Sequence, residues 1–444
     1  MTSGERSPTT TNFCMTEHII VIGGGAGGLE LAVKLARRTR RRSSVEVTLV
    51  DKNPTHIWKP LFHEVATGSM NSYHDESSYR MLARKHGFRF MLGKVSAIDP
   101  AAKSVVLAPV IDEREREILG KRSLDYTQLV VAVGSLSNDF GIDGVKLHSR
   151  ALDSREEAER FHKNFTAHLH RANAENGDDG RLAVVIVGGG ATGVELAADM
   201  HNVVRRLREY GFPDFSADRL EVSIIEAAPA LLPRLPERIG VSVRKELERI
   251  GVNVLVDTQV SRVEEEVVQT SDGRRIPAHM SVWAAGVRAP DFLAESGFPT
   301  DRIGRIEVED TLEVRGMENV FAIGDCAACS CADGTEVPPR AQAAHQMASV
   351  AARNVLARRE GKKLKPFVYR DFGSLVNLSS YSTVGNLMGN LVRGTVFVEG
   401  RIARMVYLSL YRLHQSAVHG PFSTLLIMVG DRIYKATRAE VKLH

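Results

Sequence analysis

Two glycine-rich segments of this 444-residue sequence have the spacing that binds a diphosphate. One begins at Ile20 and reads IVIGGGAGGLELA, and the other begins at Val185 and reads VIVGGGATGVELA. Three glycines in each fit the pattern GxGxxG, which allows a tight turn, a close backbone approach to a pyrophosphate and close packing of the next helix. The amides that open that helix then face the phosphates. The predicted dinucleotide-binding glycines are Gly23, Gly25, Gly28, Gly188, Gly190 and Gly193.

An acidic residue completes each segment. Residues 45–50 form a strand-like run that ends in Asp51, and residues 221–225 form one that ends in Glu226. Either carboxylate is placed to accept hydrogen bonds from ribose hydroxyls. A carboxylate at Glu226 also repels a 2′-phosphate, and no Arg follows it directly, so NADH is favoured over NADPH. Two dinucleotide sites in one chain suggest a bound flavin and an exchanging nicotinamide, because hydride passes between two such cofactors.

Other residues with chemical potential lie on the predicted helices. Glu195 comes two residues after the last glycine of the second loop, and Glu30 has the same place in the first. The residues alone leave open whether Glu195 is structural or catalytic. Gln342 and Gln346 share one face of a helix predicted over residues 341–359, where they either present two amides to one ligand or form an exposed polar face.

The late cysteines do not complete a metal site. Cys326, Cys329 and Cys331 read CxxCxC, but no second cluster supplies further ligands. We therefore predict no metal and interpret these thiols as packing or bystander groups.

The elements that must position these residues predict an α/β fold with two Rossmann-like dinucleotide-binding domains, for FAD and NADH, plus a C-terminal membrane-associating region. Two further buried strands, residues 129–133 before Gly134 and residues 320–323 before Gly324 and Asp325, suggest that the chain returns to the first domain. A crossover helix is expected over residues 151–175, and the charged run 112–117 is expected at a hairpin end. The predicted domains are a flexible tail (1–17), a discontinuous FAD-binding domain (18–150 and 305–375), an NADH-binding domain (151–304) and a membrane-attachment and dimerisation region (376–444).

Composition narrows the class of partner. The net charge of +4 is too small to mark a nucleic-acid binder. The four cysteines indicate a reducing compartment, and the first 18 residues lack the apolar core of a signal peptide. Residues 391–444, however, contain eight Lys or Arg against three Asp or Glu among many apolar residues. This region is expected to lie on an anionic membrane surface without crossing it, although packing on the protein's own core or on a dimer mate is the alternative. Basic side chains expected to face the headgroups are Arg412, Arg432, Lys435 and Arg438.

Taken together, these features resemble the type II NADH dehydrogenases, which are NADH:quinone oxidoreductases among the two-dinucleotide-binding flavoproteins. The resemblance covers residues 18–435. It is carried by the two glycine-rich loops and by NPTHIWKPLFHEVATG (53–68), YTQLVVAVGS (126–135), WAAGV (283–287), Gly324-Asp325 and AQAAHQ (341–346).

The resemblance implies specific roles. FAD would bind the first loop, with Gly134, Gly324 and Asp325 beside it, and NADH would bind the second. Glu195 would sit near the nicotinamide and the quinone. The resemblance also implies that Gln342, His345 and Gln346 line the quinone site.

Hydride would pass from NADH to FAD and two electrons from there to a membrane quinone, without proton pumping. A homodimer, bound peripherally at the cytoplasmic face of the inner membrane, is expected. One departure concerns the quinone site: after YRDFGSL (369–375) family members commonly continue with Leu-Gly-Arg or Leu-Gly-Lys, whereas this chain reads Leu378-Ser379-Ser380.

Other readings stay open at this point. A sulfide:quinone oxidoreductase has a similar layout but needs redox cysteines that reach the flavin, and the late cysteines cluster beside Gly324-Asp325 instead. A disulfide reductase is weaker, because residues 51–71 contain no Cys. Another flavin-dependent NADH oxidoreductase is a further alternative. From a different class, the chain could be a non-catalytic flavin-binding membrane protein.

Overall fold

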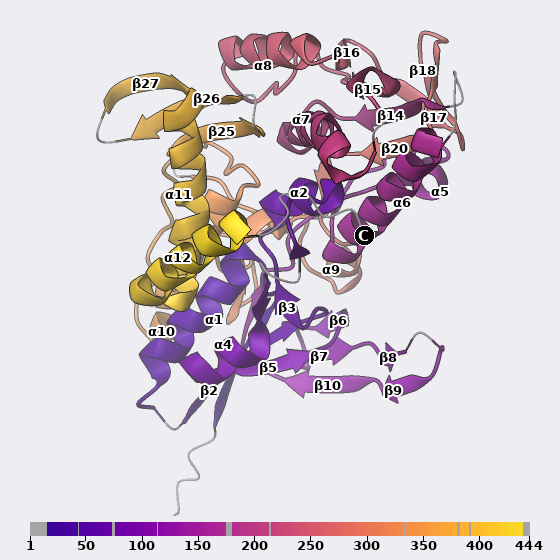
Figure 1. Cartoon of the computed structure of the whole chain (residues 1–444). Helices are drawn as coiled ribbons and strands as arrows, with labels where there is room; N and C mark the ends of the chain where they lie inside the picture. The colour runs from indigo at the N-terminus through magenta and orange to yellow at the C-terminus, as the bar shows by residue number, and fades with distance from the viewer. Residues whose placement is uncertain are drawn as a thin grey trace, which may run out of the picture.

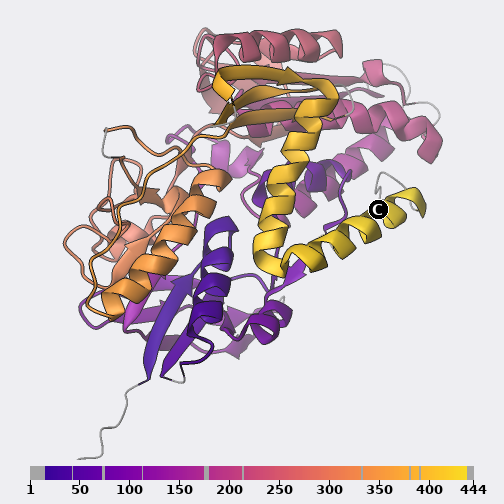
Figure 2. The same ribbon diagram turned by 90° about the vertical axis from the view of Figure 1, so that its left-hand side faces the viewer.

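The computed structural model describes residues 16–42, 44–72, 76–112, 114–174, 180–212, 215–331, 334–379, 382–389 and 392–437. Most of the predicted N-terminal tail, Ser380 and the last seven residues therefore lie outside the described part. Two parallel sheets form the framework, and the C-terminal helices α11 and α12 run along one side of it (Figures 1 and 2).

The first sheet is parallel throughout and has the order β23-β11-β1-β2-β5. Its central strands are apolar and buried on both faces, as parallel strands covered by helices must be. Helices α1 and α10 pack against each other on this unit. Because β23 pairs with β11, the chain returns to the first sheet after completing the second. The strands are β1 (Glu17–Ile22), β2 (Val45–Asp51), β5 (Arg89–Leu92), β11 (Gln128–Val131) and β23 (Val320–Ala322).

The second sheet repeats the plan with the order β13-β20-β14-β15-β16 and only parallel pairs. Each sheet has a three-stranded antiparallel companion, β10-β7-β6 for the first and β17-β18-β19 for the second. The strands are β13 (Ser149–Arg150), β14 (Leu182–Val187), β15 (Leu220–Ile225), β16 (Asn253–Leu255), β20 (Met280–Trp283), β6 (Val95–Asp99), β7 (Ser104–Leu107), β10 (Arg122–Asp125), β17 (Val260–Val263), β18 (Val267–Thr270) and β19 (Arg275–Pro277).

Helices connect and cover the sheets. The helix predicted over residues 341–359 is confirmed at both ends as α10, and the predicted crossover is confirmed as α6, which begins at Arg155. The charged run at 112–117 lies at the turn of the hairpin β8 (Val110–Ile111) and β9 (Glu117–Leu119), as predicted. The helices are α1 (Ala26–Thr39), α2 (Phe62–Thr67), α4 (Tyr79–His86), α5 (Val145–His148), α6 (Arg155–Ala174), α7 (Ala191–Arg206), α8 (Glu237–Arg249), α9 (Phe292–Glu295) and α10 (Ala341–Arg359).

The C-terminal region begins with an antiparallel sheet of β25 (Gly373–Leu378), β26 (Ser382–Gly389) and β27 (Val392–Glu399). Helix α11 (Gly400–His419) runs from this sheet to α1, and α12 (Pro421–Thr437) leaves it at an angle after Gly420 (Figure 2). No helix among the described residues is long and apolar enough to cross a membrane.

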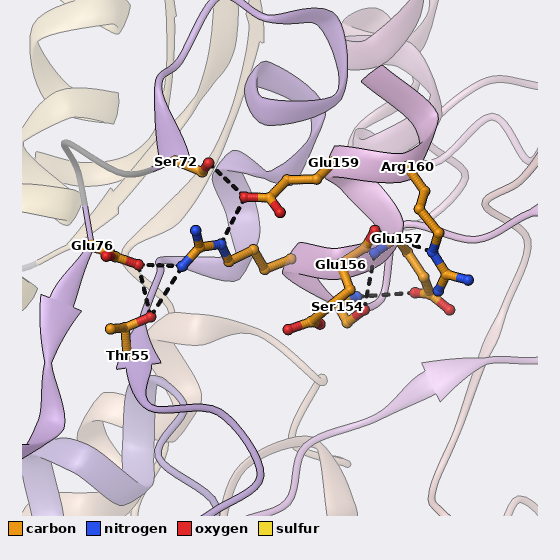
Figure 3. Close-up of polar contacts among 9 residues, drawn as sticks. Thr55, Ser72, Glu76, Ser154, Glu156, Glu157, Glu159 and Arg160 are labelled. Carbon is orange, nitrogen blue, oxygen red and sulfur yellow. Dashed lines mark hydrogen bonds and ion pairs between the residues drawn. The ribbon is translucent and has the colours of Figure 1, made fainter. Parts of the chain in front are cut away.

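A polar network connects the first unit to the start of α6 (Figure 3). Arg155 forms ion pairs with Glu76 and with Glu159, and only 16% of its side chain is exposed. Glu159 accepts a 2.7 Å hydrogen bond from Ser72, and Glu76 accepts one of 2.8 Å from Thr55. Thr55 belongs to β3 (Thr55–His56), which pairs with β4 (Ser77–Ser78). These contacts fix where the crossover to the second sheet begins.

Candidate functional site

The first glycine-rich loop joins β1 to α1 and leaves space for a phosphate. Gly23 has a φ of +94°, and a Cβ at Gly28 would lie 1.9 Å from the Gly23 carbonyl oxygen, so neither position accepts a side chain. A Cβ at Gly25 would meet nothing within 4 Å. Helix α1 begins at Ala26 with no side-chain cap, so its first amides are free to bind an anion. These features fit the diphosphate of a dinucleotide cofactor.

Asp51, the last residue of β2, binds the backbone of this loop. Its Oδ2 accepts a 2.6 Å hydrogen bond from the Gly24 amide and its Oδ1 accepts one of 2.8 Å from the Asn53 amide. Burial raises the pKa of Asp51 against these two hydrogen bonds. The carboxyl therefore lies beside the loop, where the sequence predicts a ribose acceptor, and the ribose contact itself stays a prediction.

The second loop, between β14 and α7, repeats this geometry. Gly188 has a φ of +115°, and a Cβ at Gly193 would lie 2.1 Å from the Gly188 carbonyl oxygen. Glu226 takes the place of Asp51: its Oε2 accepts a 2.7 Å hydrogen bond from the Gly189 amide and its Oε1 accepts one of 2.8 Å from Ala228. A Cβ at Gly190 again meets open space. The two repeats thus agree in backbone, glycine placement and the use of the acid.

A cavity of about 1060 Å³ extends from the second loop to α10, β25 and α11. Its volume exceeds the usual range for a small-molecule pocket, so it can hold more than one small ligand or a dinucleotide. Among the predicted site residues it is lined by Gly188, Gly190, Glu226, Glu195, Gln342 and His345. Gly193 and Gln346 are not in its wall.

Glu195 lies in this wall among other ionisable groups. Its Oε1 accepts a 2.9 Å hydrogen bond from the Asn377 amide, and its Oε2 lies 3.6 Å from Nδ1 of the buried His63. Burial raises its pKa well above the ordinary value, and the nearby Asp199 and Glu64 raise it further. These surroundings favour the protonated form of Glu195.

The surroundings of Glu195 include a second buried acid. Asp199 lies 3.5 Å from Nε2 of His63 and hydrogen-bonds Ser379. Ser379 stands at the step where the sequence departs from the family pattern. Ser380, the position of the missing basic residue, lies outside the described residues.

Glu30, the counterpart of Glu195 in the first repeat, also lines the cavity but is surrounded by donors. His414 Nδ1 lies 2.8 Å from its Oε1, His345 Nδ1 lies 2.7 Å from its Oε2, and Lys34 lies 3.0 Å away. Burial opposes ionisation, but hydrogen bonds from the two histidines and the charge of Lys34 outweigh it and lower the pKa of Glu30 to about 2. Glu30 is therefore a buried carboxylate.

Apart from His345, sequence reasoning did not find the histidines around these two glutamates. His56 and His63 stand within the segment 53–68 that carried the resemblance, so a signal for them was present. His414 had no local signal, because its partner Glu30 is 384 residues away in the chain.

The two glutamines of α10 hold the segment before β25. Gln342 donates to Asp371 Oδ1 and to the Gly373 carbonyl, and its Oε1 accepts from the Phe372 amide. Gln346 exchanges two hydrogen bonds with the backbone of Arg370. Both amides thus lie on one helix face, as the spacing predicted, and here they bind protein backbone. Their contact with a ligand stays a prediction.

The residues predicted beside the first cofactor meet where β11 and β23 end. Gly134 and Gly324 have φ values of +71° and +75°. Ser135 donates a 3.0 Å hydrogen bond to Asp325. Next to them, Cys326 and Cys329 are buried free thiols, and burial raises the pKa of each to about 12. Among the described residues no group of three or more His, Cys, Asp or Glu is placed to hold a metal ion.

Known proteins resemble this chain in sequence. Residues 17–348 match the family model described as pyridine nucleotide-disulphide oxidoreductase. The chain is 40% identical to the type II NADH:quinone oxidoreductase of Haemophilus influenzae over 96% of its own length and 100% of the relative's. It is 30% identical to the type II NADH:quinone oxidoreductase Ndh of Mycobacterium tuberculosis, covering 92% and 86%.

Solved structures share the fold. NDH2 from Plasmodium falciparum in complex with NADH superposes with a TM-score of 0.79 at 20% identity, covering 96% of this chain and 100% of that one. The sulfide:quinone oxidoreductase of Aquifex aeolicus superposes with a TM-score of 0.70 at 19% identity, covering 91% and 92%.

Proposed function

The chain belongs to the pyridine nucleotide-disulphide oxidoreductase family and, within it, to the type II NADH:quinone oxidoreductases, and from this premise we propose how its residues divide the reaction. The enzyme is an FAD-dependent NADH:quinone oxidoreductase. The first loop holds FAD and the second loop takes NADH. The two loops share their geometry, so each can hold a dinucleotide. The observation that divides their roles is that the second loop lines the large cavity, where a substrate can exchange, and the first loop does not.

The protein's own residues bind and orient the reactants. Bound FAD supplies the hydride acceptor and the electron donor to quinone. Glu226 orients the NADH ribose, and its negative charge disfavours a 2′-phosphate. Glu195, whose raised pKa favours its protonated form, lies where the two substrates approach each other and donates a hydrogen bond or a proton. Gln342 and Gln346 hold residues 370–373, of which Phe372 and Gly373 line the cavity, and we assign this part of the wall to the quinone.

Quinones with long tails dissolve in membranes, and we propose that α12 docks there. Helix α12 exposes one apolar face, defined by Phe422, Leu425, Leu426, Met428, Val429 and Ile433, each at least 42% exposed. A face of this kind enters the interface of a bilayer, assisted by basic residues. A homodimer that buries the same face is the alternative.

One expected headgroup contact does not hold. Arg412 forms a 2.8 Å ion pair with Asp431 and a hydrogen bond with Gln415, and its side chain is only 24% exposed, so it joins α11 to α12 instead of facing outward. Arg432 is exposed. The side chains of Lys435 and Arg438 lie outside the described residues.

The two buried thiols Cys326 and Cys329 do not support the rival chemistry. A sulfide:quinone oxidoreductase needs a cysteine thiolate at the flavin, whereas Cys326 and Cys329 are buried and protonated at neutral pH. Cys326 donates instead to the Val131 and Ile323 carbonyls. The likeness to the Aquifex enzyme is one of fold.

Steady-state assays test the assignment of roles. Purified protein should oxidise NADH with a soluble quinone analogue, and Glu195→Gln should lower kcat about a hundredfold while keeping bound FAD, if its proton is used. Unchanged kcat in Glu195→Gln would remove this residue from the reaction.

Membrane docking has its own assay. Full-length protein should co-sediment with anionic vesicles, and Phe422→Ser with Leu426→Ser should release it while leaving the rate with a short-tailed quinone unchanged. Arg432→Gln is the matched control for charge alone. If the wild type stays in solution at low salt and is dimeric, the apolar face is a dimer interface.

A further inference from the structure

The reaction needs a proton that neither substrate carries. Reduction of quinone by NADH is NADH + H⁺ + quinone → NAD⁺ + quinol. The hydride brings two electrons and one hydrogen, so one proton per turnover must come from water. Once substrates fill the cavity they exclude bulk water, and a protein group must deliver that proton.

A chain of histidines leads from the surface to the cavity wall. At the outer end, His419 Nε2 lies 3.1 Å from Ser77 Oγ near the end of α11. His419, Ser77, His56 and His414 share the wall of a small cavity of about 10 Å³, enough for about one water molecule. At the inner end, Glu30 joins His414 to His345, and His345 lines the large cavity with 41% of its side chain exposed.

Hydrogen-bond geometry indicates which histidine nitrogens along this path carry protons. His56 Nδ1 lies 2.9 Å from the Gly24 carbonyl, which only accepts, so Nδ1 carries a proton. Burial lowers the pKa of His56 to about 3, so the ring is neutral and its Nε2 is bare. His414 Nε2, 2.9 Å away, must therefore donate to it.

The second nitrogen of His414 faces a carboxylate. With Nε2–H already assigned, one more proton lies between His414 Nδ1 and Glu30 Oε1 over 2.8 Å. Since Glu30 is ionised, this hydrogen bond places the proton on His414 Nδ1, so both nitrogens of His414 act as donors. His414 packs against the indole of Trp58 at 4.3 Å between ring centroids, a favourable place for a cation.

We propose that His419, His414, Glu30 and His345 form a proton-uptake path that supplies quinone reduction. This rests on the proposed function and deepens it. The doubly protonated form of His345 gives its Nε2 proton to a quinone oxygen, so one N–H bond breaks, one O–H bond forms and a neutral ring remains with Nδ1–H on Glu30. The ring then turns so that its bare nitrogen faces Glu30, and the Nδ1 proton of His414 passes through a Glu30 oxygen to that nitrogen. His414 is recharged from water through the small cavity and His419. His345 is the catalytic residue, and Glu30 and His414 are positioning and relay residues.

Among the described residues, the titratable groups beside this path include Lys34, Lys85 and His86. Lys34 on α1 contacts Glu30, and Lys85 and His86 on α4 lie near His419. Both lysines favour anions nearby, whereas burial lowers the pKa of His86 to about 4. Lys34 shares the Glu30 carboxylate with His345, and Lys85 donates to the His419 carbonyl.

Stopped-flow kinetics of the holoenzyme separate the path from the overall function. His414→Gln and Glu30→Gln should leave flavin reduction by NADH within about twofold and slow reoxidation by a quinone analogue at least about tenfold. The slowed step should fall further as pH rises and recover with added imidazole. Arg38→Gln, which removes an exposed charge of α1 outside the path, should do neither.

Two further measurements keep the proposal falsifiable if those variants fold poorly. His419→Gln, at the half-buried outer end, should slow reoxidation in the same pH-dependent and imidazole-sensitive way. ¹⁵N-histidine NMR should show both nitrogens of His414 protonated at neutral pH, and one bare nitrogen in His56. A neutral His414, equal loss of both half-reactions, or a pH profile identical to the wild type would overturn the path. A wild type that fails to reduce quinone at all would instead overturn the proposed function.

Discussion

The two glycine-rich repeats share a backbone geometry, but two equivalent glutamates, Glu30 and Glu195, lie in different surroundings. Both loops contain a glycine at positive φ and a second glycine packed against the first. In both, a carboxyl group accepts a hydrogen bond from an amide of the loop. Glu30 and Glu195 occupy equivalent positions in these repeats, yet the pKa of Glu30 is lowered to about 2 and the pKa of Glu195 is raised well above its ordinary value.

The difference arises from neighbours that the repeats do not share. Glu30 meets two histidine N–H groups and a lysine, whereas Glu195 meets another acid and a neutral histidine, since burial lowers the pKa of His63 to about 4. The similar local sequences therefore determine the geometry of the two loops, whereas contacts with distant segments shift the pKa of each glutamate.

The largest effect is expected from substituting a glycine that both repeats share. Gly28→Ala places a Cβ against the Gly23 carbonyl and should cost at least about 3 kcal/mol of stability and abolish FAD retention. Gly193→Ala makes the same clash in the second loop and should keep FAD but raise KM for NADH steeply. Flavin content and thermal unfolding measure both.

Gly25→Ala is the matched control for the clash. Its Cβ meets nothing in the protein, so the fold should persist while FAD affinity falls, because the methyl group enters the phosphate space. Full flavin content in Gly28→Ala would contradict the assignment of the first loop.

The glutamates themselves should respond to pH with opposite signs. The folded-state pKa of Glu30 is lowered from 4.5 to about 2, so its contribution is present above pH 4.5 and is lost as pH falls towards 2. Glu30→Gln should therefore cost about 3 kcal/mol at neutral pH and little near pH 2. The pKa of Glu195 is raised, so keeping it protonated costs stability as pH rises above its unfolded value, and Glu195→Gln should gain in relative stability.

Denaturant unfolding at several pH values checks this prediction. The two variants should diverge as pH increases from the acidic range to neutral. Parallel curves would mean that the glutamates have the same charge and that the contrast between the repeats is wrong.

A smaller effect concerns cofactor choice in the second repeat. Glu226→Gln combined with Ala227→Arg removes the repulsion of a 2′-phosphate and adds an attraction, so the ratio of kcat/KM for NADPH to that for NADH should rise about tenfold or more. The equivalent Asp51→Asn should leave this ratio unchanged. An unmoved ratio in the first variant would show that Glu226 is not the ribose ligand.

The smallest effect is expected at α10. Gln342→Leu loses the hydrogen bonds to residues 371–373 and should slow quinone-dependent reoxidation of the flavin about fivefold while leaving its reduction by NADH intact. Gln346→Leu, outside the cavity wall, should have a weaker effect. Equal damage to both half-reactions would remove Gln342 from the quinone side.

Features encoded locally were predictable from sequence. The two loops, the acids after the strands and α10 follow from glycine spacing, apolar runs and helical composition, each read within a few residues. The predicted tail, residues 1–17, and Ser380 fall wholly or largely outside the described residues, and the domain limits stay a prediction.

Features that depend on packing between distant segments were not predictable. The charge of Glu30 depends on His345 and His414, and the inward turn of Arg412 depends on Asp431 in the next helix. The glutamine face of α10 was predictable, but its occupation by residues 370–373 was not. Such contacts are set by which surfaces meet, and spacing along the chain carries no signal for them.

The central claim, that one repeat keeps FAD while the other exchanges NADH to feed a quinone, is tested most directly by an anaerobic titration of purified protein. The account predicts one FAD per chain, bleaching of its visible absorbance by one equivalent of NADH, and full recovery on adding one equivalent of quinone analogue. Protein that carries no flavin, or flavin that NADH reduces but quinone fails to reoxidise, would contradict it.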